Sequence, residues 1–338
     1  MIARSTFRAP RGLVKRNLQT LLASSLLRRR VAVARHRETV ELPDGDFVHL
    51  DWAERHHEDA SSPLLLVLHG LEGSIRSRYA AAVMQAAGQA GFAAGLLNAR
   101  GCSGVHNRKA ASYHAGLTTD LAFVLDRLKA RWPGRAVVAV GYSLGGNALL
   151  KFLGEAGEDA PLRAAVAVSV PFDLVDSARA IDSGFARFYQ WVLMRRMRAS
   201  VERKLGHHDM PVTAEELPAL RSFFDFDERV TAPLHGFASA LDYYRASSCA
   251  GYLRSIAVPT LILHARDDPF MTPACIPDET MLSPQVTLEV SDHGGHVGFL
   301  ENRVPFALRS WLEARIVPHL QQVLGAQATA AQGQSARP

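Results

Sequence analysis

The sequence has few cysteines, and none of its apolar runs is long enough to cross a bilayer. Cys102, Cys249 and Cys275 are too few and too scattered for a disulfide framework or a four-cysteine zinc site. A membrane-spanning helix needs about 20 apolar residues, whereas the longest runs, such as Pro63–Leu68, have the length of a strand. These absences exclude an integral membrane protein and favour a reducing compartment, so we expect a cytoplasmic protein.

Acidic residues are absent from residues 1–37, which carry ten Lys and Arg. The other 301 residues hold 28 basic and 33 acidic side chains, a net charge of −5, so the overall +5 comes from this basic N-terminal arm. A folded body without a basic surplus does not indicate a nucleic-acid partner. We interpret residues 1–37 as a packed, partly solvated helical arm; the alternatives are peripheral contact with a membrane or other polyanion, and a targeting segment.

Short strands and helices alternate through the rest of the chain. Residues 39–42 and 47–52 alternate apolar and polar side chains around the turn sequence Pro43–Asp46, which predicts an edge hairpin. Six continuous apolar runs predict strands covered on both faces: Leu64–His69, Ala93–Asn98, Ala136–Gly141, Ala164–Val170, Thr260–His264 and Val286–Val290. Helices are predicted at Tyr79–Ala90, Leu117–Arg131, Leu144–Gly157 and Pro305–Leu324. This alternation predicts an α/β fold with a mostly parallel central sheet and flanking helices.

One long interval interrupts this alternation. About ninety residues between Val170 and Thr260 contain no clear buried strand, so we predict a helical cap at residues 175–253, inserted after the sixth core strand. The core then comprises residues 38–174 and 254–324. Within the cap, Phe185–Leu205 is expected to form an amphipathic helix, with a membrane-docking lid as the alternative. Residues 325–338 are rich in Ala, Gln, Gly and Ser and are predicted to be a disordered tail.

A serine flanked by glycines follows one of the predicted strands. The segment Gly141–Gly145, with Ser143 at its centre, lies between the run Ala136–Val140 and a predicted helix. Glycines two residues before and after the serine leave room for closely packed backbone in a sharp turn. The serine then stands at a helix N-terminus, where free N–H groups favour developing negative charge. The pattern indicates that Ser143 is a nucleophile.

A serine nucleophile requires a base and an orienting acid later in the chain. The loop after the last predicted strand contains His293 and His296. We assign the base to His296, because the glycines before it let the loop aim the ring, and regard His293 as a loop residue. The acid should follow the preceding strand, where two aspartates are adjacent. We choose Asp268, directly before a proline, with Asp267 as the alternative.

Two backbone N–H groups should face the oxygen of a bound carbonyl and form an oxyanion hole. Leu144, directly after the serine, supplies one candidate donor. The second is Leu71, in the loop Gly70–Gly73 after the first of the continuous apolar runs. The glycines of this loop allow it to approach the serine closely.

The cap is expected to form a wall of the substrate pocket. Ligands of open α/β sheets bind beyond the C-terminal ends of the strands, where the serine also projects. An insertion placed there brings its apolar side chains over the serine. We therefore expect Phe188, Trp191, Met194 and Phe237 to favour an apolar acyl group.

Together these motifs resemble the α/β-hydrolase superfamily, and within it the YheT-like and EMB8-like branch related to the ABHD1 and ABHD3 hydrolases. The resemblance spans about residues 10 to 320 and is carried by Asn17–Thr20, His69–Gly73, Asn98–Cys102, Gly141–Asn147, Phe226–Phe237, Asp242–Tyr244, Asp267–Phe270 and His293–Phe299. Asn17 departs from the family pattern, which has His there. The resemblance implies hydrolysis of short-chain or lipid-like carboxylic esters without a cofactor.

The predicted function is that of a serine hydrolase with a Ser143–His296–Asp268 triad and an acyl-enzyme intermediate. Two alternatives remain: an acyltransferase that passes the acyl group to an alcohol or thiol, and a catalytically silent binding protein on the same fold. A small-molecule ester is the expected ligand. No metal is expected, because the adjacent histidine pairs lack a third ligand at suitable spacing.

Overall fold

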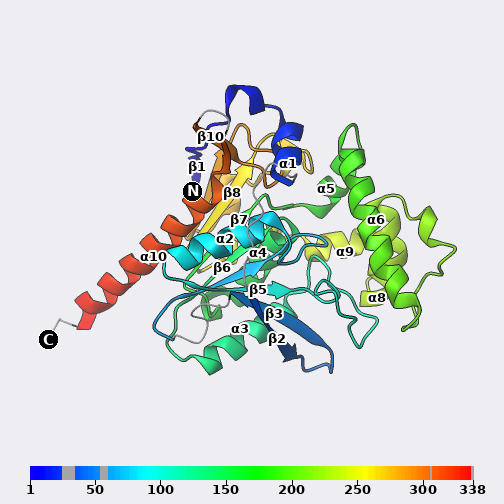
Figure 1. The fold of residues 1–338 in the computed structure, drawn as a ribbon, viewed down its shortest axis with the longest axis horizontal. Helices are drawn as coiled ribbons and strands as arrows, with labels where there is room; N and C mark the ends of the chain where they lie inside the picture. The colour runs from blue at the N-terminus through cyan, green and yellow to red at the C-terminus, as the bar shows by residue number, and fades with distance from the viewer. Residues whose placement is uncertain (25–34, 54–59, 305–306, 336–338) are drawn as a thin grey trace.

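The structure is a computed structural model that describes residues 1–24, 35–53, 60–304 and 307–335 (Figure 1). A nine-stranded sheet forms its centre, with the strand order β1-β9-β8-β7-β6-β4-β5-β3-β2. Its strands are β1 (Ile2–Arg4), β2 (Arg35–Glu41), β3 (Phe47–Ala53), β4 (Leu64–Leu68), β5 (Ala93–Asn98), β6 (Val137–Tyr142), β7 (Ala164–Val168), β8 (Thr260–Ala265) and β9 (Val286–Ser291). A separate hairpin consists of β10 (Leu300–Val304) and β11 (Ala307–Ser310).

Helices cover both faces of the sheet and form the insertion between β7 and β8. The α-helices are α1 (Arg16–Ser24), α2 (Arg78–Gln89), α3 (Thr119–Arg131), α4 (Leu144–Ala156), α5 (Leu174–Ile181), α6 (Ala186–Leu205), α7 (Phe223–Phe226), α8 (Ala232–His235), α9 (Ala240–Ser247) and α10 (Leu312–Ser335). A π-helical turn, η4, covers Asp227–Thr231. Short 3-10 helices are η1 (Arg11–Leu13), η2 (Gly157–Asp159), η3 (Leu217–Ala219), η5 (Ala250–Ser255), η6 (Pro273–Cys275) and η7 (Glu279–Met281).

The predicted α/β fold is confirmed. Strands β1, β9, β8, β7, β6, β4 and β5 pair in parallel, whereas β3 and β2 are antiparallel and form the predicted edge hairpin. Side chains of β4 show why the buried strands are apolar throughout. Leu64, Leu66 and Leu68 pack in the same cluster as α3 and α4 side chains, and Leu65 and Val67 pack in the opposite cluster with α2 and α10.

The N-terminal arm is not purely helical. Its first residues form β1, which adds a parallel strand to β9 with Ile2 opposite Leu288. Further along, Phe7 is buried against Phe299 and Trp311. A strand of three residues is too short to show a periodicity, so only its pairing partner reveals it. The three consecutive arginines at 28–30 lie outside the described residues.

The predictions for the C-terminal region are wrong in two respects. The last helix begins at Leu312, and the strands β10 and β11 precede it as an antiparallel hairpin. Phe299 and Trp311, which flank these strands, stack on each other. The predicted disordered tail is helical from residue 325 to Ser335 as part of α10. Ala and Gln are strong helix formers, so a segment with little apolar content still continues a helix that has already formed.

The insertion is helical, as predicted. Residues 169–259 are all described and contain no strand. Figure 1 shows α6 and α8 at one side of the molecule, beyond the end of the central sheet. No helix in the described ranges is both long and apolar enough to span a bilayer.

Candidate active site

Ser143 lies at the apex of a sharp turn between β6 and α4. Its backbone has φ of 52° and ψ of −119°, a conformation that non-glycine residues rarely adopt. A Cβ at Gly141 would lie 2.5 Å from the Gly145 carbonyl oxygen, and one at Gly145 would lie 2.4 Å from the His69 oxygen. Both glycines are therefore required by backbone contact, and the strained turn holds the serine hydroxyl above the sheet.

The structure brings Ser143, His296 and Asp268 together in one chain of hydrogen bonds. Ser143 Oγ lies 2.9 Å from His296 Nε2, and His296 Nδ1 lies 2.8 Å from Asp268 Oδ2. Asp268 is 1% exposed, and its other oxygen accepts the Phe270 N–H at 2.9 Å. The Phe270 ring stacks on the imidazole with 3.9 Å between centroids. The carboxylate and the stacked ring together fix the orientation of the imidazole.

Asp267 makes different contacts from Asp268. Its Oδ1 accepts the Gly295 N–H at 2.9 Å, and its Oδ2 lies 3.4 Å from Nδ1 of the half-exposed His293. Asp267 thus holds the loop that carries His296 and does not contact the His296 ring. Burial raises the pKa of the Asp267 carboxyl above its ordinary value.

The N-terminal arm braces the same loop. Thr20 Oγ accepts the His296 backbone N–H at 2.9 Å. The buried Gln19 pairs with Leu300, accepting its N–H at 2.7 Å and donating to its carbonyl at 3.1 Å. Asn17 accepts a hydrogen bond from Tyr189 of α6 at 3.1 Å and so connects the arm to the insertion. Sequence reasoning assigned no role to these residues; the only signal was their presence in the segment that resembles the family.

The loop after β4 lies directly against the serine. A Cβ at Gly70 would be 3.2 Å from Ser143 Cβ. His69 Nε2 accepts the Ala99 N–H at 3.1 Å, so the ring proton is on Nδ1, which lies 2.7 Å from the Gly70 carbonyl oxygen. The Gly73 N–H also donates to this oxygen. Burial lowers the pKa of His69, which keeps the ring neutral in this role.

This arrangement sets the direction of the Leu71 amide. In a trans peptide the N–H points opposite to the preceding carbonyl, and His69 and Gly73 hold the Gly70 carbonyl. Within the described residues, neither the Leu71 nor the Leu144 N–H has a hydrogen-bond acceptor. Leu144 is the first residue of α4, so its N–H is one of the free donors at that helix end. Both amides are thus available to a ligand atom.

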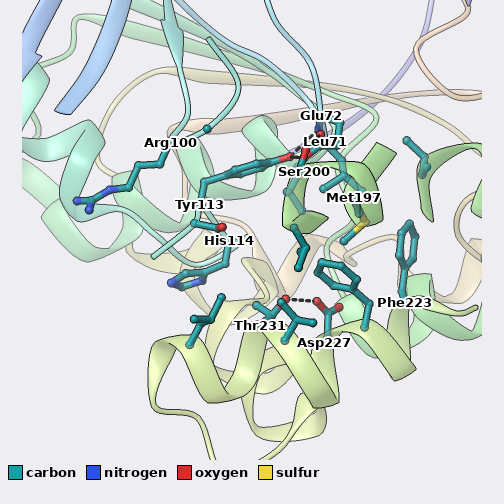
Figure 2. Close-up of a pocket in the computed structure, with 18 of the residues that line it drawn as sticks. Leu71, Glu72, Arg100, Tyr113, His114, Met197, Ser200, Phe223, Asp227 and Thr231 are labelled. Atoms are coloured by element: carbon teal, nitrogen blue, oxygen red, sulfur yellow. Dashed lines mark hydrogen bonds between the residues drawn. The ribbon is translucent and has the colours of Figure 1, made fainter. Parts of the chain in front are cut away.

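Glu72 connects this loop to the insertion (Figure 2). Its Oε2 accepts a hydrogen bond from Ser200 of α6 at 2.7 Å, and its Oε1 accepts one from Tyr113 at 3.2 Å. The Tyr113 hydroxyl accepts the Glu72 backbone N–H at 2.6 Å. Glu72 also has a positive φ of 52°. The residue next to Leu71 is therefore held by both the core and the cap, a link that local sequence does not reveal.

A cavity of about 190 Å³ opens beside Ser143 and His296. Apolar side chains of the insertion form much of its wall, and they include Leu174, Ile181, Leu193, Met197, Val201, Phe223, Phe226 and Val230. Figure 2 shows Met197 and Phe223 on this wall, opposite Tyr113 and His114. The arrangement suits a ligand with one apolar arm and a reactive group at the serine.

The sequence-based selection of cap residues is wrong. Phe188 and Trp191 are 45% and 51% exposed, and neither lines the cavity. Met194 packs inside the insertion, and Phe237 packs against Tyr243 and His114, also without lining the cavity. The cavity face of α6 carries Leu193, Met197, Ser200, Val201 and Lys204 instead. Trp191 is two residues from Leu193, which places it on the opposite side of a helix that turns 100° per residue. Composition identified the helix but not the face that meets the core.

Two cations of the cavity wall direct their hydrogen bonds to the protein. Arg100 binds Asp120 through two bonds of 2.7 Å and Asp44 through one of 2.6 Å, which raises the pKa of the guanidinium. Lys204 donates to the carbonyls of residues 110 and 111 and to Ser112, and burial lowers its pKa to about 8. These contacts fasten the loop after β5 to both the core and the insertion. In the part of the chain that the structure describes, no cluster of three or more His, Cys, Asp or Glu side chains is placed to bind a metal.

Asp227 is a buried carboxyl at the cavity wall. It accepts hydrogen bonds from Thr231, drawn in Figure 2, and from Tyr244 at 2.8 Å. Burial raises its pKa from 3.8 to about 6, against the opposing effect of these hydroxyls. Below about pH 3 the carboxyl is protonated in both the folded and the unfolded chain, so ionisation costs nothing. As the pH rises to about 6 the unfolded chain loses this proton first, and folding becomes less favourable.

We therefore expect Asp227→Asn to raise the free energy of unfolding by roughly 2 kcal/mol at pH 7.5 and to leave it nearly unchanged at pH 4. Asparagine keeps an acceptor for Thr231 and presents an N–H to Tyr244. Urea unfolding at both pH values measures the difference, and the exposed Asp209→Asn is the matched control. A loss of stability at pH 7.5 would show that the carboxylate itself stabilises the insertion.

Comparison with known proteins identifies the family of this chain. The family model described as alpha/beta hydrolase fold matches residues 63–303, and the chain belongs to this family. The chain is 42% identical to YheT of Escherichia coli (strain K12), over 90% of this chain and 93% of that protein. It is 30% identical to Phospholipase ABHD3 of Mus musculus, over 79% of this chain and 67% of that protein. The resemblance to the YheT and ABHD3 branch is thereby confirmed.

A solved structure with the same fold is the esterase Pf2001 of Pyrococcus furiosus. It aligns with a TM-score of 0.53 and 16% identity, covering 86% of this chain and 93% of that chain. At this identity the likeness concerns the fold alone. On the evidence of the family model and the sequence relatives, the protein is an α/β-hydrolase of the branch that includes YheT and ABHD3.

Proposed function

We propose that the protein hydrolyses carboxylic esters, with Ser143 as nucleophile, His296 as general base and Asp268 as the orienting carboxylate. The observation that carries this proposal is the pair of hydrogen bonds, 2.9 and 2.8 Å long, that joins the three side chains at the wall of an apolar cavity. The name of the mouse relative, a phospholipase, supports an ester of a lipid-like acid as substrate.

In the proposed reaction, Ser143 Oγ attacks the ester carbonyl carbon while His296 Nε2 takes the hydroxyl proton. The tetrahedral intermediate collapses to an acyl-enzyme, and the imidazolium gives the proton to the departing alcohol. Water then attacks the acyl carbon while His296 takes a proton from it. The second tetrahedral intermediate collapses, the bond between Ser143 Oγ and the acyl carbon breaks, the imidazolium returns the proton to Ser143 Oγ, and the free acid is released. Asp268 keeps the other proton on Nδ1 and stabilises the imidazolium in both steps.

The Leu71 and Leu144 N–H groups are proposed to bind the oxyanion of both tetrahedral intermediates. Two such donors in a water-poor site stabilise the negative charge more than they stabilise the neutral ester, which is the requirement for faster chemistry. The contacts of His69 and Glu72 on either side of Leu71 hold one donor in place before the substrate binds. The acyl chain is proposed to lie along the cap wall of the cavity.

Turnover of p-nitrophenyl esters of graded acyl length by the full chain tests this function. The products are analysed with and without an added alcohol. We expect free acid as the main product in both cases. A new ester in place of the acid would indicate an acyltransferase, and no turnover of any ester would favour a binding protein on this fold.

We expect Met197→Trp to shift the preference toward shorter acyl chains, because the larger side chain fills the cap wall of the cavity. Since one methylene in an apolar pocket changes kcat/KM by roughly tenfold or more, the ratio of kcat/KM for long over short esters should fall at least tenfold. Glu202→Trp adds the same side chain on the exposed face of the same helix. The ratio should stay constant in this control, and equal ratios in both variants would place the acyl chain elsewhere.

A further inference from the structure

The outer face of α6 and Phe185, the residue just before the helix, expose an aromatic cluster formed by Phe185, Phe188 and Trp191. These side chains are 53%, 45% and 51% exposed. Their rings contact one another: the centroids of Phe185 and Phe188 are 5.8 Å apart, and those of Phe188 and Trp191 are stacked at 6.1 Å. Among the described Phe and Trp residues, only Phe224 is comparably exposed, at 44%. Contiguous exposed aromatics of this kind mark an interaction surface.

Cationic side chains share this face. Positions 187, 188, 191, 195 and 198 fall on one side of a helix that turns 100° per residue, so Arg187, Arg195 and Arg198 flank the aromatics. The Arg195 guanidinium lies over the Trp191 ring at 5.0 Å from its centroid. Acidic side chains near this face include Asp182, whose carboxylate is 3.9 Å from Arg187 in an exposed pair, and the exposed Glu202. The aromatic end of the helix carries the positive excess.

The N-terminal arm lies beside the same helix. The hydrogen bond between Tyr189 and Asn17 places α1 beside the N-terminal half of α6. On α1, Leu18 is 37% exposed, and Lys15 and Arg16 at its start are also exposed. Figure 1 shows α6 running lengthwise through the insertion, away from the central sheet.

We propose that this outer face of α6 docks on an anionic lipid surface. Trp and Phe at one side of a helix with arginines beside them are the composition of helices that lie in the membrane interface, where aromatic rings settle at headgroup depth and cations meet anionic lipid. The opposite face of α6 lines the cavity beside Ser143. Docking in this way places one helix between the bilayer and the site. The proposal does not depend on the triad, and its test needs no turnover.

Sedimentation of the full chain with vesicles provides the test. Vesicles of phosphatidylcholine alone are compared with vesicles that also contain phosphatidylserine, at low and high salt. We expect the chain to bind the mixed vesicles at low salt and to leave them at high salt. No binding to either vesicle would overturn the proposal.

Three variants locate the contact. Phe188→Ser with Trp191→Ser removes the rings, and Arg187→Glu with Arg195→Glu reverses two charges; each pair should weaken binding at least tenfold. Arg196→Glu, an exposed position outside this face, is the matched control and should change binding less than threefold. Quenching of Trp191 by brominated lipid, lost in Trp191→Phe, would demonstrate direct contact.

A further pair of substitutions tests whether α6 or the N-terminal arm contacts the membrane. If Lys15→Glu with Arg16→Glu abolishes binding while the α6 variants bind normally, the arm alone is the membrane contact and the proposal is wrong. Far-ultraviolet circular dichroism and thermal melting of each variant verify that the fold is retained. Arg196→Glu reverses one charge and the α6 charge pair reverses two, so the two losses of binding free energy are compared per charge. An equal loss per charge would also overturn the proposal, because net charge alone would then explain binding.

Discussion

Ser143→Ala is expected to lower kcat for ester hydrolysis by roughly four to six orders of magnitude and to abolish covalent labelling by a fluorophosphonate probe. Alanine removes the only atom proposed to bond to the acyl carbon, whereas the cavity and the two backbone donors remain. Substrate binding should therefore persist while turnover disappears. Mass spectrometry of the labelled wild-type chain should place the modification on Ser143.

Ser183→Ala is the control for this change, because Ser183 is exposed between α5 and α6 and its hydroxyl donates to the Ala180 carbonyl. This variant should be labelled and should turn over at the wild-type rate. Labelling that persists in Ser143→Ala would assign the nucleophile to another residue. A wild-type chain that is neither labelled nor active would favour the binding-protein alternative.

Asp268→Asn is expected to lower kcat by roughly four orders of magnitude. The asparagine amide would donate to His296 Nδ1, which moves the ring proton to Nε2, and that nitrogen then has no lone pair for the Ser143 proton. Asp267→Asn should reduce kcat less than about tenfold, because its amide oxygen still accepts the Gly295 N–H. Steady-state kinetics on one soluble ester compares the two.

Melting temperatures provide the control for these two variants. If the melting temperature of Asp268→Asn is close to that of the wild type, the loss of kcat comes from the changed chemistry and not from unfolding. Labelling by fluorophosphonate should slow in Asp268→Asn in proportion to kcat. If Asp267→Asn is the more damaging change, the orienting acid is Asp267 and the proposed assignment is wrong.

The buried strands were predictable because their pattern is local. Leu64–Leu68 is apolar at every position, and the structure buries alternate side chains against helices on opposite faces. The candidate site was predictable for a related reason. In a parallel sheet, the residues that follow the strands gather at one edge, so Ser143, Asp268 and His296 were expected to meet although 153 residues separate the serine from the histidine.

Other features depend on contacts that no local pattern encodes. The strand β1 is recognisable only by its pairing with β9, and Gln19 and Thr20 gain their role only when the arm lies against the loop of His296. The helix beyond residue 325 was not predicted, although no long-range contact is needed to explain it. Its low apolar content predicts disorder, whereas alanine-rich sequence readily extends a helix that has already formed.

The sequence by itself determined the order of the buried core strands and the helices that connect them, the sharp turn at Ser143 and the residues that follow these strands. The reason is that periodicity, glycine content and turn chemistry act between near neighbours. Tertiary structure alone decided which face of α6 meets the core. It put Met197 on the cavity wall, left Trp191 exposed and joined Glu72 to Ser200. The reason is physical: a helix with apolar side chains around most of its circumference has several faces that it can bury, and only its packing against distant elements selects one.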